Sequence, residues 1–221
     1  MPEERKVSAY VVAAMCGCFK RESGVNPGIW ESLIPTSWDH QYQYDGIGGY
    51  GLGQWTNVGT PYGRCWNLHQ FATSHGYADG DGDGQIAFVI EENYWTGSNS
   101  ILGYNSLSDF LESDSQDVDA LTAEFLACWE GVPGNALAER QEAARAFLGF
   151  IQDNADKPLD SWEWTSGNFY MGFKSAEQYA NVMCVYRALN GYVPQGKDVP
   201  LPLIIARRKK KNGKHRRTIL L

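Results

Sequence analysis

The sequence lacks the features that define membrane-spanning, secreted and disulfide-stabilised proteins. It has no apolar run near the roughly 18 residues that a membrane span requires, so we expect no membrane span. Its first residues include Pro2-Glu3-Glu4, acidic where a signal peptide is basic, and the apolar run that follows is only about eleven residues long. We therefore expect cytoplasmic synthesis without a signal peptide. Five cysteines form an odd number without regular spacing, which predicts buried free thiols.

Acidic residues are missing from the C-terminal end. None follows Asp198, whereas residues 207–221 hold 8 of the 19 lysines and arginines, and all 26 acidic residues fall within residues 1–206. The composition changes at a Pro-rich stretch, so we predict a folded domain over 1–192, then a linker and basic tail over 193–221. Such a tail either stays solvated or holds an anionic polymer, and nucleic acid is not an expected partner.

Hydrophobic spacing predicts a mostly helical chain. The predicted helices cover residues 8–22, 62–75, 85–96, 117–130, 137–155 and 175–190. Residues 23–60 are rich in glycine and have no helical period, which predicts a loop with a short β-hairpin over residues 42–52. The expected fold class is therefore α+β, predominantly helical.

Glu22 is the leading candidate for a catalytic group. It lies at the end of an apolar helix that Ser8 can cap, just before the helix-breaking pair Ser23-Gly24. We expect partial desolvation there to raise the pKa of Glu22. A carboxylic acid that is still protonated near neutral pH can donate its proton to a glycosidic oxygen.

A glycine-rich stretch, residues 46–53, precedes Gln54 and Trp55. Glycine allows the backbone to come close to a ligand, and the rings of Tyr50 and Trp55 offer faces for a sugar. Gln54 either orients a water or a sugar amide, or satisfies the backbone of the loop. Ser23 and Asn26 are interpreted as turn-forming residues.

Three sequence blocks carry a resemblance to a known family. They are ESGVNP at 22–27, GYGLGQW at 49–55 and FLACWEGVP at 125–133. In this order they resemble the phage tail lysozyme family, within the lysozyme-like superfamily of goose-type lysozymes and lytic transglycosylases. The third block has two residues between its Glu and its Pro, where the family pattern has one. The resemblance covers about Val7 to Phe150.

The resemblance implies a lysozyme-like fold and cleavage of peptidoglycan. The bond would be the β-1,4 link between N-acetylmuramic acid and N-acetylglucosamine, with Glu22 as general acid. Trp129 and Glu130 would line the cleft, although Glu130 is equally interpreted as a helix-end residue paired with an arginine. Asp39 and Asp45 are alternative second carboxylates. The relatives often need only one Glu, so a lytic transglycosylase is an alternative.

The resemblance also implies a phage or prophage origin. The enzyme would be made in the bacterial cytoplasm and reach the cell wall at lysis or on a phage tail. Its partners would then include peptidoglycan, phage tail proteins and, through the basic tail, anionic wall polymers.

The acidic stretch at residues 79–86 has two interpretations. Asp79, Asp81 and Asp83 match the first positions of a calcium loop, but Ile90 stands where a bidentate Glu belongs. Otherwise the stretch is an acidic turn that caps the following helix. No cofactor is required by the expected reaction, and Ca²⁺ is an option only.

Two other function classes compete. The run CGCF at 16–19, with His40, His69 or His75 as base, faintly resembles the papain-type cysteine peptidases. A non-catalytic wall-binding tail module would keep the scaffold and use its aromatic rings to bind glycan.

Overall fold

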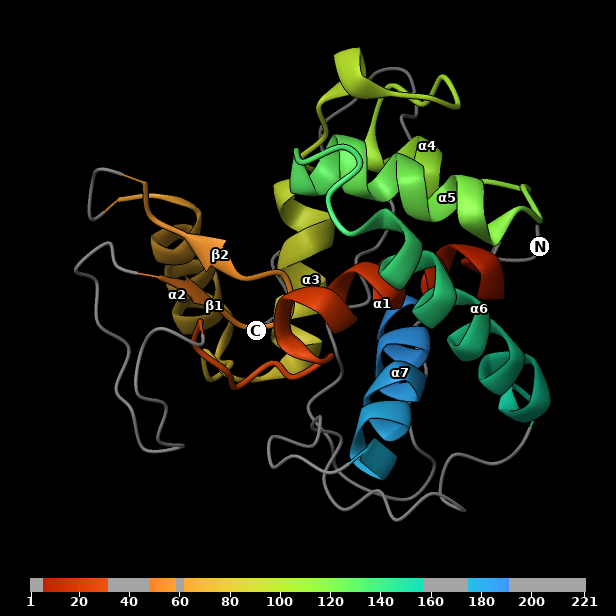
Figure 1. Cartoon of the computed structure of the whole chain (residues 1–221). Helices are drawn as coiled ribbons and strands as arrows, with labels where there is room; N and C mark the ends of the chain where they lie inside the picture. Colours follow the sequence, from red (N-terminus) through yellow and green to blue (C-terminus); the bar gives the residue numbers. More distant parts are fainter. Residues whose placement is uncertain (1–5, 32–47, 59–61, 157–174, 191–221) are drawn as a thin grey trace, which may run out of the picture.

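The protein folds around one central helix, as the computed structural model shows for residues 6–31, 48–58, 62–156 and 175–190. In Figure 1 this helix, α1, lies in the middle, with α5 above it, α7 below it and α6 beside it. The predominantly helical α+β fold predicted from the sequence is confirmed. The elements are α1 (Ala9–Ser23), β1 (Gly49–Tyr50), β2 (Trp55–Thr56), α2 (Arg64–His75), α3 (Gly82–Glu92), η1 (Gly97–Asn99), α4 (Leu107–Leu111), α5 (Val118–Phe125), η2 (Leu126–Glu130), α6 (Leu137–Asn154) and α7 (Ser175–Asn190).

Both ends of α1 follow from local sequence. The Ser8 hydroxyl accepts a hydrogen bond from the Val11 amide, and Gly24 ends the helix with a left-handed φ of +68°. Most of the helix is buried. At Gly17 it approaches α6 so closely that an added Cβ would lie 2.5 Å from the Arg140 carbonyl oxygen. The middle of α1 therefore packs closely against α6.

The β-hairpin lies later in the chain than predicted. Tyr50 pairs with Trp55 and Gly49 with Thr56, while Trp30 forms an isolated bridge to Tyr50. Residues 42–47 of the predicted hairpin lie outside the described residues. Residues 51–54, here called the glycine motif, form the turn itself, because Gly51 has a φ of +76° and Gln54 a φ of +49°. This is why the strands flank the motif.

Three helix boundaries differ from the prediction for physical reasons. Helix α3 starts at Gly82, because the Asp81 carboxylate accepts hydrogen bonds from the amides of Asp83 and Gly84. It stops at Glu92, because Asn93 takes a left-handed φ of +45°. The helix predicted over 117–130 is α-helical only to Phe125 and continues as the π-helical turn η2. Helices α2, α6 and α7 match their predictions closely.

The cysteine prediction is confirmed. All five cysteines lie within the described residues, where each is buried and none forms a disulfide. None of the helices in the described parts of the chain is long and apolar enough to cross a membrane.

A buried carboxylate fastens the loop around η1 to α5. Glu124 accepts hydrogen bonds from the Ser100 hydroxyl (2.5 Å) and from the amides of Ile101 (2.6 Å) and Leu102 (2.9 Å). We expect Glu124→Gln to lower the free energy of unfolding by about 2–3 kcal/mol, because an amide group replaces one acceptor oxygen with a donor. Urea unfolding measures this. The exposed Glu91→Gln should have no effect, and equal losses in the two variants would contradict the prediction.

Candidate active site

Glu22 is paired with a buried arginine at the end of α1. Its side chain is 24% exposed, whereas that of Arg140 on α6 is 2% exposed, and Nη2 of Arg140 donates to Oε1 of Glu22. Arg140 also donates through Nη1 to the Cys18 carbonyl (3.0 Å) and through Nε to the Asn135 carbonyl (3.1 Å). The sequence predicted apolar surroundings for Glu22, and the structure gives it a charged partner. Its carboxylate is held in place yet open to a ligand.

Glu130 is a second carboxyl group close to the first. It ends the π-helical turn and is half-buried, with Oε1 shielded from solvent and without a hydrogen-bond partner among the described residues. Burial raises the pKa of Glu130 to about 8; the negative charge of Glu22 adds to this shift, and Arg140 and Arg64 oppose it. Glu130 is therefore mostly protonated at neutral pH. Arg140 binds Glu22 and not Glu130.

The residues after Glu22 connect the helix end to the glycine motif. The Ser23 hydroxyl lies within hydrogen-bond distance of the carbonyls of Phe19 (3.1 Å) and Leu52 (2.9 Å), and it accepts from the Asn26 amide. The Asn26 side chain accepts from the Gly28 amide (2.9 Å). These are the contacts of turn-forming residues, and they fix the glycine motif beside Glu22.

Two glutamine side chains hold the glycine motif in shape. Gln54 donates to the carbonyls of Gly51 (2.9 Å) and Ile29 (3.3 Å). Gln85, which sequence reasoning missed, accepts from the Leu52 amide (2.8 Å) and donates to the Pro27 carbonyl (2.7 Å). Of the two interpretations of Gln54, these contacts correspond to satisfying the loop backbone. No local pattern in the sequence marks Gln85, because its partners are 33 and 58 residues away.

The aromatic rings predicted to bind sugar, those of Tyr50, Trp55 and Trp129, are buried within the protein. Tyr50 is buried against Trp30, with ring centroids 4.7 Å apart. Trp55 and Trp129 are buried and meet edge to face at 5.8 Å. Their use as sugar platforms stays a prediction.

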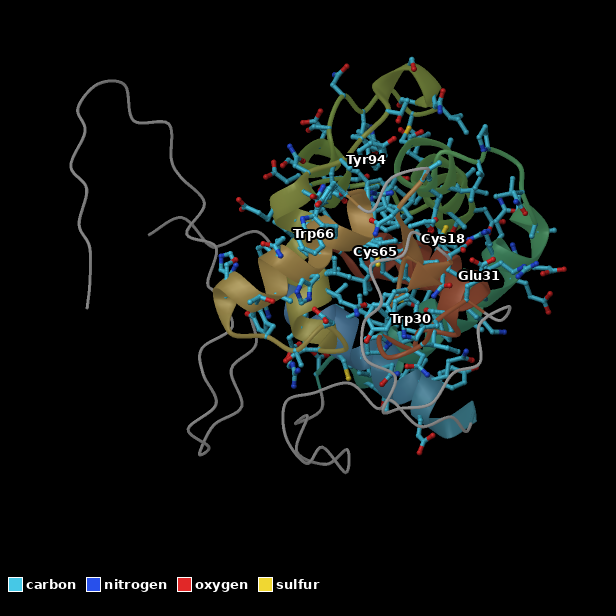
Figure 2. The ribbon with its side chains drawn as sticks, turned by 90° about the vertical axis from the view of Figure 1, so that its left-hand side faces the viewer. Cys18, Trp30, Glu31, Cys65, Trp66 and Tyr94 are labelled. Atoms are coloured by element: carbon cyan, nitrogen blue, oxygen red, sulfur yellow. The ribbon has the colours of Figure 1, made fainter. Side chains whose placement is uncertain are left out.

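Two other aromatic side chains, Tyr62 and Tyr94, are more exposed to solvent. Tyr62 is 68% exposed and Tyr94 is 40% exposed. The Arg64 guanidinium lies over the rings of both Tyr94 (4.5 Å) and Trp129 (4.9 Å). Figure 2 labels Tyr94, Trp66 and Glu31 in one view, together with Trp30, which is buried. The side chains of Tyr62 and Tyr94 are exposed and therefore accessible to a ligand.

Glu31 is a carboxylate that sequence reasoning missed. Its Oε2 accepts from the Gly49 amide (3.1 Å), and its own amide donates to the Gly49 carbonyl (2.8 Å). The predicted second carboxylates, Asp39 and Asp45, lie outside the described residues. Glu31 therefore joins them as a candidate.

Each carboxylate of the acidic stretch has a partner within the protein. Asp79 contacts Nδ1 of His69 (2.9 Å), Asp81 caps α3, and Asp83 pairs with the buried Arg187 (3.1 Å). Burial raises the pKa of Asp83 to about 6, against the opposing charge of Arg187. In the described parts of the chain, no group of three or more potential ligands is arranged to hold a metal ion.

We expect added calcium to leave the melting temperature unchanged, because a metal would have to displace these three partners. Differential scanning fluorimetry with Ca²⁺ at about 10 mM, above the weakest range of protein calcium sites, tests this. A rise in melting temperature that a chelator reverses, and that Mg²⁺ does not reproduce, would establish a calcium site instead.

The thiols are poorly suited to nucleophilic catalysis. Burial raises the pKa of both Cys16 and Cys18, which disfavours the reactive thiolate. Of the candidate bases, His69 is paired with Asp79, His75 stacks on Phe71, and His40 lies outside the described residues.

Comparison with known proteins identifies the family of this chain. The sequence profile described as phage tail lysozyme matches residues 3–151. A search of curated proteins found no match. The matched region contains the helix that carries Glu22, the glycine motif, the π-helical turn and most of α6. This chain belongs to the phage tail lysozyme family.

Proposed function

We propose that the protein cleaves the β-1,4 bond between N-acetylmuramic acid and N-acetylglucosamine, with Glu22 as the general acid. Family membership indicates a phage-type enzyme that degrades peptidoglycan. The observation that supports the role of Glu22 is its position. It is the partly exposed carboxylate that a buried arginine fixes beside the glycine motif.

The proposed step transfers a proton from Glu22 to the glycosidic oxygen as that bond breaks. The sugar ring would cover the exposed part of Glu22 and exclude water from the transfer. The step requires Glu22 in its protonated form in the substrate complex. The carboxylate that remains after the transfer is the form that Arg140 binds in the free protein. Asn135 and Cys18 hold Arg140, so little reorganisation is needed.

The second half of the reaction has two candidate routes. In a hydrolase, one of Asp39, Asp45 or Glu31 would activate water or stabilise the cationic sugar. In a lytic transglycosylase, the 6-hydroxyl of the muramic acid residue would attack in place of water. Neither route requires a cofactor.

Mass spectrometry of the products from purified peptidoglycan tests the proposal. Reducing muramic ends would support a hydrolase, and anhydromuramic ends would support a transglycosylase. Cut peptides with intact glycan, or no cleavage at all, would contradict the proposed function.

Delivery to the wall is the remaining part of the proposal. Phage tail lysozymes act on the cell wall, and this protein would be released at lysis or carried on a phage tail. The basic segment 207–221, which lies outside the described residues, would bind anionic wall polymers.

A further inference from the structure

The unpaired oxygen of Glu130 requires an explanation. Buried side-chain oxygens almost always have a hydrogen-bond partner, and a lone buried carboxylate is especially costly. Oε1 of Glu130 has no such partner in the described parts of the chain. A neutral carboxylic acid tolerates this environment far better than a carboxylate does.

The π-helical turn determines where Glu130 lies. Such a turn holds one more residue than an α-helical turn and so changes the direction of the side chains beyond it. Trp129 remains stacked on Phe125, with centroids 4.9 Å apart, and Gly131 ends the turn with a φ of +74°. The negative charge of Glu22 contributes to the raised pKa of Glu130, and the negative charge of Glu130 contributes to the raised pKa of Cys18 on α1. The turn thus brings a second carboxyl group to the end of α1.

Two arginines are near Glu130, and both are bound elsewhere. Arg64 of α2 makes two hydrogen bonds of 2.8 Å to Glu92. Arg140 of α6 uses Nε and Nη1 for backbone carbonyls and Nη2 for Glu22. Each arginine nonetheless attracts negative charge on Glu130. If Glu130 ionised, it would compete with Glu22 for Arg140.

We propose that Glu130 is a positioning residue for Glu22: as a neutral acid it leaves Arg140 bound to Glu22, and as a carboxylate it draws Arg140 away and stops cleavage. The charged and titratable groups that interact electrostatically with Glu130 are Glu22 and Cys18 from α1, Arg140 from α6 and Arg64 from α2. The effect on cleavage rests on the proposed role of Glu22. The electrostatic coupling between the carboxyl groups of Glu22 and Glu130 is independent of that proposed role.

The coupling can be measured without substrate. Protein labelled with ¹³C at the glutamate carboxyl carbon is titrated by NMR, with Glu22→Gln and Glu130→Gln used to assign the two signals. We expect the Glu130 signal to titrate near pH 8 and the Glu22 signal to shift with the same midpoint. That shift should be absent in Glu130→Gln.

The NMR experiment also tests the coupling between Glu22 and Glu130 if Glu130→Gln fails to fold. Glu130→Asp then serves for assignment, since it removes the glutamate signal but keeps a carboxyl group. A wild-type protein in which no glutamate signal titrates between about pH 7 and 9 overturns the proposal. A Glu22 signal that ignores the ionisation of Glu130 also overturns it.

The consequence for activity is a loss at alkaline pH. A single ionisation near pH 8 predicts about a tenfold fall in kcat/KM between pH 7 and pH 9. In Glu130→Gln, which resembles the neutral acid, we expect this fall to disappear, while the exposed Glu139→Gln should behave as wild type. An unchanged pH profile in Glu130→Gln overturns the proposal. A wild type that shows the NMR coupling but cleaves no glycan would refute the proposed function alone.

Discussion

Glu22→Gln is expected to lower kcat for peptidoglycan cleavage by about 10²–10⁴-fold, the usual contribution of a general acid. Glutamine has nearly the same shape as glutamate but has no acidic proton to give to the glycosidic oxygen. It can still accept a hydrogen bond from Arg140, so we expect the variant to fold and to bind peptidoglycan. Turbidity loss and soluble muropeptides, measured at several enzyme concentrations, give the rate.

The control for this variant is Glu139→Gln on α6. Glu139 is exposed and contacts Arg21, the residue before Glu22, at 3.6 Å. Glu139→Gln therefore changes the net charge by the same amount as Glu22→Gln, at a position close to it in space. The activity of Glu139→Gln should nevertheless match that of the wild type. If Glu22→Gln kept more than about a tenth of the wild-type kcat, the general acid would have to be another group.

Arg140→Met is expected to lower the free energy of unfolding by about 3–5 kcal/mol, the usual cost of breaking a buried charge pair. Methionine fills part of the space but donates no hydrogen bonds. The carbonyls of Cys18 and Asn135 would lose their donor, and Glu22 would lose its counter-charge. Urea unfolding followed by circular dichroism measures the change.

Arg145→Met on the same helix provides a matched comparison. Arg145 pairs with Asp119 at 2.7 Å, but both side chains are exposed, and such pairs contribute about 0–1 kcal/mol. Arg140→Lys should fall between the two methionine variants, since an ammonium keeps the charge but not the guanidinium geometry. Equal losses for the methionine variants at 140 and 145 would show that the contacts of Arg140 contribute little.

The sequence was informative where the structure depends on local interactions. Ser8 and Gly24 determine the two ends of α1, and their roles can be read from neighbouring residues. The same is true of Asp81, whose capping contacts are two and three residues away. These short-range signals predicted the helix that carries Glu22. They also predicted that the acidic stretch caps the helix that follows it.

The sequence was uninformative where partners lie far apart in the chain. The contact between Arg140 and Glu22 spans 118 residues, and no periodicity predicts it. The π-helical turn was also missed, because apolar residues continue through Cys128 and Trp129 as they would in an ordinary helix. Trp55 illustrates a third limit: an aromatic residue beside a glycine motif fits a sugar platform and a core ring equally well, and burial distinguishes them only in three dimensions.

The contact at Gly17 has a consequence for building chimeric lysins. Helix α1 cannot be exchanged alone, since its glycine is matched to the carbonyl of Arg140 and to the Cβ of Ala144 on α6. A donor helix with any larger residue at that position would push α6 outward and carry the arginine away from the glutamate. Helices α1 and α6 must therefore be exchanged together, although the 113 residues between Ser23 and Leu137 separate them in the chain.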